Sequence, residues 1–165
     1  KPSDHKPRLL IEAAQKGLRK HGEELCGDWV KLSTTDTSFI AVLSDGLGSG
    51  VKANIQATLT AEIAGKMLAS GAQIDDVIET LVATLPTCRV RRLAYATFCI
   101  LQVQDGRDAY LAEYDAPPLF MVRGHRLQSL PLQERSIHGR SIRECQFNVQ
   151  EGDYLVMVSD GWPTE

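Results

Sequence analysis

The chain has 165 residues, of which 43% are hydrophobic and 24% are charged, and its formal net charge is −3. This composition fits one soluble globular domain with a sizeable core, and the negative charge argues against non-specific binding to nucleic acid or to a membrane surface. No apolar run is long enough to span a bilayer, and the first eight residues are polar and charged. We therefore expect neither a transmembrane segment nor a signal peptide, and we expect a cytoplasmic protein.

The cysteines give no sign of a metal site or of a disulfide framework. They are widely spaced and form no C-x-x-C motif; they are Cys26, Cys88, Cys99 and Cys145. Cys99 lies in an apolar run that is typical of a strand, so we expect a buried free thiol there.

The chain begins with a segment whose structure the pattern leaves open. Residues 1–8 are expected to be disordered, and residues 9–20 fit a short helix and an edge strand equally well. Residues 21–28 form a polar loop with two glycines and three acidic side chains.

The first clear elements are two strands. Residues 29–32 and 38–44 read as strands, and the second is a continuous apolar run, which is typical of a strand buried on both faces. The turn at 33–37 is so short that the two strands must form an antiparallel hairpin. This geometry places Asp28, before the first strand, at the same end as Asp45, after the second.

Two helices follow the hairpin. The segment 51–70 carries apolar residues on nearly every side, which predicts a long and largely buried helix that ends at Gly71. The segment 74–85 has the spacing of an amphipathic helix, with apolar residues at Ile74, Val77, Ile78, Leu81, Val82 and Leu85. We expect both helices to pack on one face of a sheet and to form a regulatory or dimer surface.

The second half of the chain consists mainly of strands. Three hairpins are expected, joining 95–103 to 108–114, 119–122 to 126–130, and 147–149 to 154–159. Helices grouped in the middle and strands in the second half predict an α+β fold with largely antiparallel sheets.

Two apolar runs end in the same Ser-Asp-Gly sequence. One places Asp45 and Gly46 at the end of a strand, and the other does the same for Asp160. If the hairpins stack as two facing sheets, these acids and Asp28 can converge. Three adjacent carboxylates repel one another, and an all-oxygen ligand set that includes the Gly46 carbonyl favours Mg²⁺ or Mn²⁺. A solvated turn after each strand remains the alternative, because Asp and Gly are common turn residues.

An ordered set of motifs carries a resemblance to a known family. The motifs are Gly27-Asp28, the stretch from Ser44 to Gly50, Tyr95-Ala96-Thr97-Phe98, Ala116-Pro117-Pro118-Leu119-Phe120, and Gly152-Asp153 through Ser159-Asp160-Gly161. From about residue 23 to its end, the chain resembles the metal-dependent serine/threonine protein phosphatases of the protein phosphatase 2C type. It is most similar to the bacterial branch typified by the stage II sporulation protein E phosphatase domain.

The resemblance implies an α-β-β-α sandwich over residues 1–165, with a binuclear Mg²⁺ or Mn²⁺ centre between the sheets. Asp45 would bridge two metals with help from the Gly46 carbonyl, Asp28 would bind one metal, and Asp160 the other. The implied activity is hydrolysis of phosphoserine or phosphothreonine on a protein by a metal-activated water. Substrates in this branch are often anti-sigma-factor antagonists or stress-signalling proteins, and homodimerisation is left open.

The sequence also departs from the family pattern. Family members supply a further metal-binding Asp after the position of Asp160-Gly161, whereas this sequence ends at Glu165. We therefore expect either a phosphatase domain that is incomplete at its C-terminus or a catalytically impaired binding module of the same fold. A nucleotide-binding loop at 46–50 is a weaker alternative, because its glycine spacing matches neither common phosphate-binding motif.

Other side chains are weaker site candidates. His21, His125 and His138 could act as general acids, but surface histidines are the more ordinary interpretation. The basic cluster Arg89, Arg91 and Arg92 could attract a phosphorylated substrate, although a solvated loop is favoured.

Overall fold

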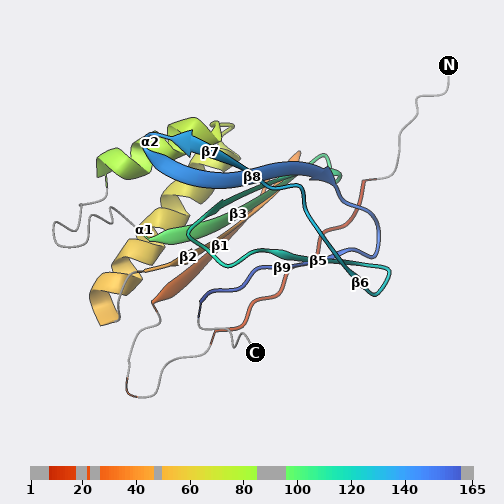
Figure 1. Cartoon of the computed structure of the whole chain (residues 1–165), viewed down its shortest axis with the longest axis horizontal. Helices are drawn as coiled ribbons and strands as arrows, with labels where there is room; N and C mark the ends of the chain where they lie inside the picture. Colours follow the sequence, from red (N-terminus) through yellow and green to blue (C-terminus); the bar gives the residue numbers. More distant parts are fainter. Residues whose placement is uncertain (1–7, 18–21, 23–26, 47–49, 85–95, 161–165) are drawn as a thin grey trace.

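The computed structural model describes residues 8–17, 22, 27–46, 50–84 and 96–160. Six strands form one antiparallel sheet in the order β1-β2-β3-β4-β8-β7, and three strands form a smaller antiparallel sheet in the order β6-β5-β9. The helices α1 (Gly50–Ala69) and α2 (Ile74–Thr84) lie on one face of the large sheet, and the small sheet lies on the other side (Figure 1). This arrangement confirms the α+β fold with two antiparallel sheets.

The strands have the following bounds: β1 Asp28–Thr34, β2 Ser38–Asp45, β3 Thr97–Gln104, β4 Asp108–Tyr114, β5 Phe120–Arg123, β6 Arg126–Gln128, β7 Gln133–Ile137, β8 Arg140–Asn148 and β9 Tyr154–Val156.

The β1–β2 hairpin forms as expected. Its turn is held by Thr35, whose amide donates to the Ser38 carbonyl at 2.8 Å and whose hydroxyl accepts from the Ser38 amide at 3.0 Å. The register pairs Asp28 directly with Asp45. The prediction that these two acids share one end of the sheet is therefore confirmed.

The alternation of side chains along the central strands divides the core into two layers. Ile40, Val42 and Ile100 point toward the helices, whereas Ala41 and Leu101 belong to the cluster between the sheets. Successive residues of a strand face opposite sides, so a strand that is apolar at every position can fill both layers. The expected burial of β2 on both faces is confirmed.

The helix α1 buries only one face, although its composition suggests burial on nearly every side. Its buried residues follow one face, and they are Ala53, Gln56, Ala57, Thr60, Ala61, Ala64, Gly65 and Leu68. Val51, Ile55 and Leu59 are 62%, 50% and 42% exposed. The prediction of a largely buried helix is therefore wrong, because α1 packs against β1, β2 and α2 on one side.

The ends of the helices agree with the sequence. Gly71 has φ of 90°, its amide donates to the Leu68 carbonyl, and the Ala72 amide donates to the Met67 carbonyl. This pair of bonds is a Schellman cap, which needs a residue in the left-handed region. The amphipathic prediction for α2 is confirmed by the burial of Ile74, Val77, Ile78 and Leu81.

The described part of the N-terminal segment, residues 8–17, is neither helix nor strand. Leu9 and Ile11 both pack against the core between the sheets. Side chains two residues apart on one side of the chain do not fit an α-helix, and no strand pairs with this segment in the described structure. Both alternatives for 9–20 are therefore wrong over 9–17. Of the segment 1–8 that was expected to be disordered, Arg8 is described and donates to the Asp36 carbonyl at 2.6 Å, whereas residues 1–7 lie outside the described part.

The first two of the three hairpins predicted for the second half are confirmed. β3 and β4 turn at Asp105 and Gly106, and β5 and β6 turn at Gly124 and His125, all with positive φ. Residues 85–95 lie outside the described part and include Tyr95, the first residue of the predicted strand 95–103, whereas Ala96 is described and directly precedes β3.

The third predicted hairpin is wrong. β8 pairs with β4 and β7 in the large sheet, whereas β9 pairs with β5 in the small sheet. The chain therefore crosses from one sheet to the other at 149–153. The sequence pattern also missed the hairpin of β7 and β8, because β7 carries mostly exposed polar side chains.

An ion pair holds this crossover in place. The Arg123 guanidinium donates to both carboxylate oxygens of Asp153, at 2.9 and 2.8 Å, and also to the Asn148 carbonyl at 3.0 Å. The Asp153 carboxylate also accepts from the Gln150 amide at 2.8 Å, and its side chain is only 4% exposed. The Arg123 side chain of β5 thus holds both the end of β8 and the turn that carries Asp153.

Asp153→Asn is expected to lower the free energy of unfolding by about 1–3 kcal/mol at neutral pH. Arg123 holds the pKa of Asp153 below its usual value. A carboxyl with a lowered folded-state pKa stabilises the fold above its unfolded-state pKa, and this contribution is lost as the pH falls through the folded-state value. Urea unfolding at about pH 5 and about pH 2 should therefore show a smaller pH effect in the variant than in wild type.

Glu151→Gln, in the same exposed turn, is the control for that measurement. An Asp153→Asn variant with wild-type stability at both pH values would contradict a stabilising role for the ion pair.

Two further expectations concern the chain as a whole. Cys99 and Cys145 are buried and free, as expected for Cys99. Over the residues that the structure describes, no helix is long and apolar enough to cross a membrane.

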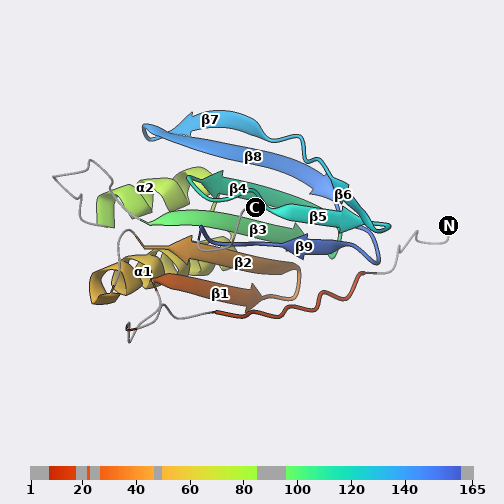
Figure 2. The ribbon, with the colours of Figure 1, turned by 60° about the horizontal axis from the view of Figure 1, so that its bottom comes forward.

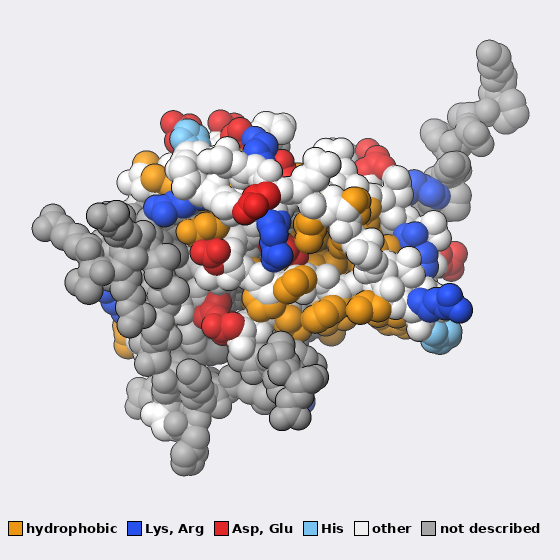
Figure 3. Space-filling model, in the orientation of Figure 1, with side chains coloured by type: hydrophobic (Ala, Val, Ile, Leu, Met, Phe, Trp, Pro, Cys, Tyr) orange, Lys and Arg blue, Asp and Glu red, His pale blue; other side chains and the backbone are white. Residues whose placement is uncertain are grey.

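Figure 3 shows apolar side chains gathered over β5 and β9, where Phe120, Tyr154 and Val156 are exposed.

Candidate metal centre

Two strand ends of the large sheet carry the first two acids. Asp28 is the first residue of β1 and Asp45 is the last residue of β2, and the two are paired across the hairpin. Thr97, the first residue of β3, is the partner of Asp45 on the other side. The Ser44 hydroxyl donates to the Thr97 carbonyl at 2.9 Å, which joins this end of β2 to β3. Asp28 and Asp45 are thus fixed by the backbone of three adjacent strands.

The small sheet brings the third acid. Asp160 follows β9 and lines the same cleft as Asp28 and Asp45, and both Asp160 and Asp28 lie close enough to Asp45 to raise the pKa of its carboxyl. Asp28, Asp45 and Asp160 are therefore brought together from two different sheets. Asp45 is the central member of the three.

The electrostatics of Asp45 reflect this position. Burial is the largest cause that raises its pKa to about 9, followed by the hydrogen bonds with Asp160 and Asp28 and by their negative charges. The metal-free arrangement therefore favours the protonated form of Asp45. A bound cation would attract the negative charge of ionised Asp45 and so favour that form. The negative charges of Asp28 and Asp160 repel it and oppose ionisation.

Gly46 adds the backbone of the site. Its amide donates to the Gly27 carbonyl at 2.8 Å, which extends the hairpin ladder beyond Asp28 and Asp45. A Cβ at Gly46 would lie 1.9 Å from the carbonyl oxygen of Ala53 in the first turns of α1. Only glycine allows this close approach of the strand end to the helix.

The donor set fits a hard divalent cation. It consists of three carboxylates and a backbone carbonyl, and Mg²⁺ and Mn²⁺ prefer such oxygen ligands. Within the described ranges, no three His, Cys, Asp or Glu side chains are already spaced as a formed metal site.

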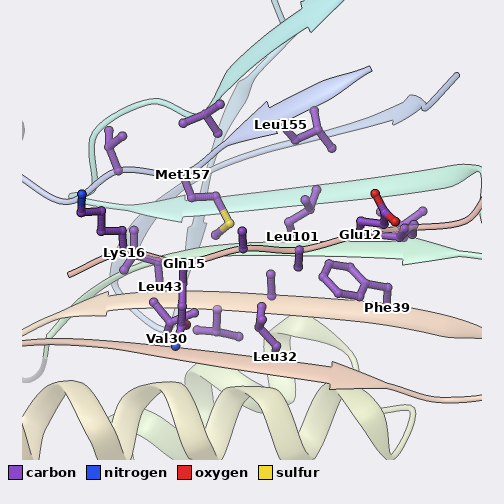
Figure 4. A pocket seen from close by; sticks show the side chains of 18 of the residues that line it. Glu12, Gln15, Lys16, Val30, Leu32, Phe39, Leu43, Leu101, Leu155 and Met157 are labelled. Atoms are coloured by element: carbon purple, nitrogen blue, oxygen red, sulfur yellow. The ribbon is translucent and has the colours of Figure 1, made fainter. Parts of the chain in front are cut away.

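A cleft between the sheets leads to these acids. Asp28, Asp45, Gly46 and Asp160 line it at one end. Apolar side chains form part of its walls, and Figure 4 shows Val30, Leu32, Phe39, Leu43, Leu101, Leu155 and Met157 around it, together with the polar side chains of Glu12, Gln15 and Lys16 from the N-terminal segment. The apolar part of the walls lowers the local polarity, which strengthens electrostatic interactions there.

The weaker candidates do not join this site. His125 and His138 occupy exposed hairpin turns with φ of 61° and 47°. The surface interpretation of these two histidines therefore fits the structure. His21 and the arginines at 89, 91 and 92 lie outside the described residues.

Sequence reasoning missed one buried charged pair. Glu113 is fully buried in β4, and its carboxylate is paired with Arg143 of β8 at 2.8 Å. A single acid inside the otherwise uncharged run 109–114 was the available signal, because a charge in a buried strand needs a partner.

Comparisons with known proteins agree with this architecture. The family model for Stage II sporulation protein E (SpoIIE) matches residues 35–163. The curated Stage II sporulation protein E of Bacillus subtilis (strain 168) is 28% identical over 128 residues, which cover 74% of this chain and 15% of that protein. The chain thus spans a small part of this relative.

Solved structures show the same fold. The PP2C phosphatase domain of SpoIIE from Bacillus subtilis, solved with a fragment of the regulatory domain, superposes with a TM-score of 0.69 at 23% identity, covering 82% of this chain and 41% of that one. RsbX in complex with magnesium superposes with a TM-score of 0.68 at 20% identity, covering 89% of this chain and 72% of that one. The chain therefore belongs to the Stage II sporulation protein E family and has the fold of PP2C-type phosphatase domains.

Proposed function

We propose that this domain is a metal-dependent serine/threonine protein phosphatase. The observation that carries the proposal is the meeting of Asp28 and Asp160 at the half-buried carboxyl of Asp45, in a chain of the SpoIIE family. Acids from two sheets that converge at such a cost in repulsion indicate a site for positive charge.

Each residue has a role in the proposed centre. Asp45 would bridge two Mg²⁺ or Mn²⁺ ions, Asp28 would bind one ion, Asp160 the other, and the Gly46 carbonyl would complete the set. RsbX, a relative in fold, is described in complex with magnesium, which supports this choice of ion. Ions bound in this way lower the pKa of a bound water and offset negative charge on phosphoryl oxygens.

The chain itself supplies geometry and environment. The β1–β2 pairing holds Asp28 opposite Asp45, and the contact of Gly46 with α1 fixes the strand end. Because Asp28 and Asp45 lie on paired strands, little reorganisation of their backbone is needed when substrate binds.

The proposed substrate is a protein that carries phosphoserine or phosphothreonine. The name of the curated relative refers to sporulation. We therefore propose a role in bacterial sporulation or stress signalling, with an anti-sigma-factor antagonist or a stress-signalling protein as the substrate class.

Hydrolysis of a phosphoserine peptide is expected to require Mn²⁺ or Mg²⁺ and to stop in excess chelator. The measurement is phosphate release by the natural full-length protein with each ion, with chelator, and after the ion is restored. Calcium at equal concentration is the control for non-specific ion effects. Hydrolysis that continues in chelator would contradict the proposed centre.

A catalytically impaired binding module of the same fold is the second candidate. It is favoured by the small number of acids, since only Asp28, Asp45 and Asp160 meet among the described residues. Binding of Mn²⁺ and of a phosphoprotein without phosphate release in the same experiment would support this alternative.

A further inference from the structure

We infer that the buried ion pair of Glu113 and Arg143 is a positioning device for the candidate metal centre. The inference rests on the proposed function, because it concerns how the large sheet sets the position of Asp160 relative to Asp45.

Glu113 uses both carboxylate oxygens. Oε1 accepts the Leu119 amide at 2.8 Å, and Oε2 accepts Nη2 of Arg143 at 2.8 Å. The same Arg143 nitrogen donates to the Ala116 carbonyl at 3.1 Å. The Glu113 side chain is 0% exposed, whereas that of Arg143 is 41% exposed. The pair therefore forms a clamp on two backbone groups of residues 116–119.

These backbone groups flank the place where the chain leaves one sheet for the other. β4 ends at Tyr114 in the large sheet, and β5 begins at Phe120 in the small sheet. Pro117 and Pro118, in the middle of the crossover, have no N–H to donate. The Ala116 carbonyl and the Leu119 amide are thus the described backbone contacts through which the clamp holds the crossover to β4 and β8.

The clamp is connected to Asp160 through the small sheet. β5 pairs with β9 in the register of Phe120 with Val156, and Asp160 follows β9 after a short segment. A shift of the crossover would move β5, and β5 would carry β9 with it.

The clamp also lies toward the end of the large sheet that holds the other acids. A row of paired residues runs from Leu43 through Cys99 and Glu113 to Arg143. Leu43 precedes Asp45 by two residues, so this row is about 7 Å along the strands from the row of Asp45. The crossover, beyond Tyr114, continues toward the end where Asp45 and Asp28 lie.

The energetics favour a role in geometry over one in stability. Burying the Glu113 carboxylate costs hydration, and its pairing with the partly exposed Arg143 offsets that cost with little net gain over an apolar side chain. What an apolar pair cannot provide is a directed bond to the Leu119 amide and to the Ala116 carbonyl. The charges thus fix the direction of the crossover at a small net gain in folding free energy.

Glu113→Gln in the full-length protein tests this inference. Gln keeps an acceptor for the Leu119 amide but removes the charge that holds Arg143. We expect the affinity for Mn²⁺ to fall about tenfold, the size of effect seen when groups that orient metal ligands are removed. The affinity is measured from free Mn²⁺ in an electron paramagnetic resonance titration, at a temperature where every variant is folded.

Glu144→Gln is the matched control. Glu144 is also an acid of the large sheet paired with an arginine, since Arg135 donates to it at 2.6 Å, but its partners Arg135 and Tyr110 lie away from the crossover. We expect this variant to lower the melting temperature and to leave Mn²⁺ affinity unchanged. Arg143→Lys, which keeps the charge but shortens the reach to Ala116, decides the question if Glu113→Gln does not fold.

A double-mutant cycle with Asp160→Asn tests the route. If Glu113 acts by positioning Asp160, then Glu113→Gln should hardly change the Mn²⁺ affinity of a protein that already carries Asp160→Asn. An unchanged affinity in folded Glu113→Gln, or full additivity with Asp160→Asn, would overturn this inference alone. If wild type binds no Mn²⁺, the proposed function fails and this inference with it.

Discussion

Asp45→Asn is expected to lower the rate of phosphopeptide hydrolysis by roughly a thousandfold, which corresponds to about 4 kcal/mol of transition-state stabilisation. Asp45 is in contact with both Asp28 and Asp160 and is the proposed bridge between two ions. The amide keeps the shape of the side chain but removes the negative charge that would hold them.

Stability without metal should follow a different pattern. With its pKa raised to about 9, Asp45 is neutral at pH 7 in the metal-free fold, and Asn is also neutral. We therefore expect the melting temperature in chelator to stay the same or to rise. The measurement pairs that melting temperature with the Mn²⁺-dependent rate, in variant and wild type. A variant that keeps most of its rate but melts lower would make Asp45 a structural turn residue.

Gly46→Ala is expected to be strongly destabilising, by about 3 kcal/mol or more, because a Cβ would lie 1.9 Å from the Ala53 carbonyl oxygen. Both contacting groups are backbone, so neither can move away as a flexible side chain would. For a chain of this length, the melting temperature should fall by roughly 6–12 °C.

The control for this effect is Gly17→Ala, where an added Cβ meets nothing within 4 Å. Both variants should be melted in chelator, so that loss of metal binding does not contribute to the difference. Wild-type stability of Gly46→Ala would show that α1 moves freely relative to the end of β2, contrary to the close packing described above.

Local patterns predicted much of this fold. The short turn before residue 38 is compatible only with an antiparallel hairpin, and this alone placed Asp28 opposite Asp45. The spacing of Ile74, Val77, Ile78 and Leu81 predicted the buried face of α2. Gly71 predicted the end of α1, because the left-handed cap conformation favours glycine.

The same patterns failed where tertiary contacts decide. Composition could not tell that α1 is covered on one side only, because Val51 and Ile55 are as apolar as residues that face the sheet. Residues 147–149 and 154–159 have the pattern of a hairpin, but pairing with β4 and β5 separates them into two sheets.

For the candidate site, local sequence patterns were enough to identify the residues with the right chemistry. The repeated Ser-Asp-Gly after an apolar run marked Asp45 and Asp160, and Gly27-Asp28 marked the third acid. The meeting of Asp160 with Asp45 depends on tertiary packing, because they come from different sheets and no local rule fixes how two sheets stack. The Glu113–Arg143 clamp also depends on tertiary packing. The partners are 30 residues apart, and a sequence pattern carries no information on which distant charge will pair with a buried acid.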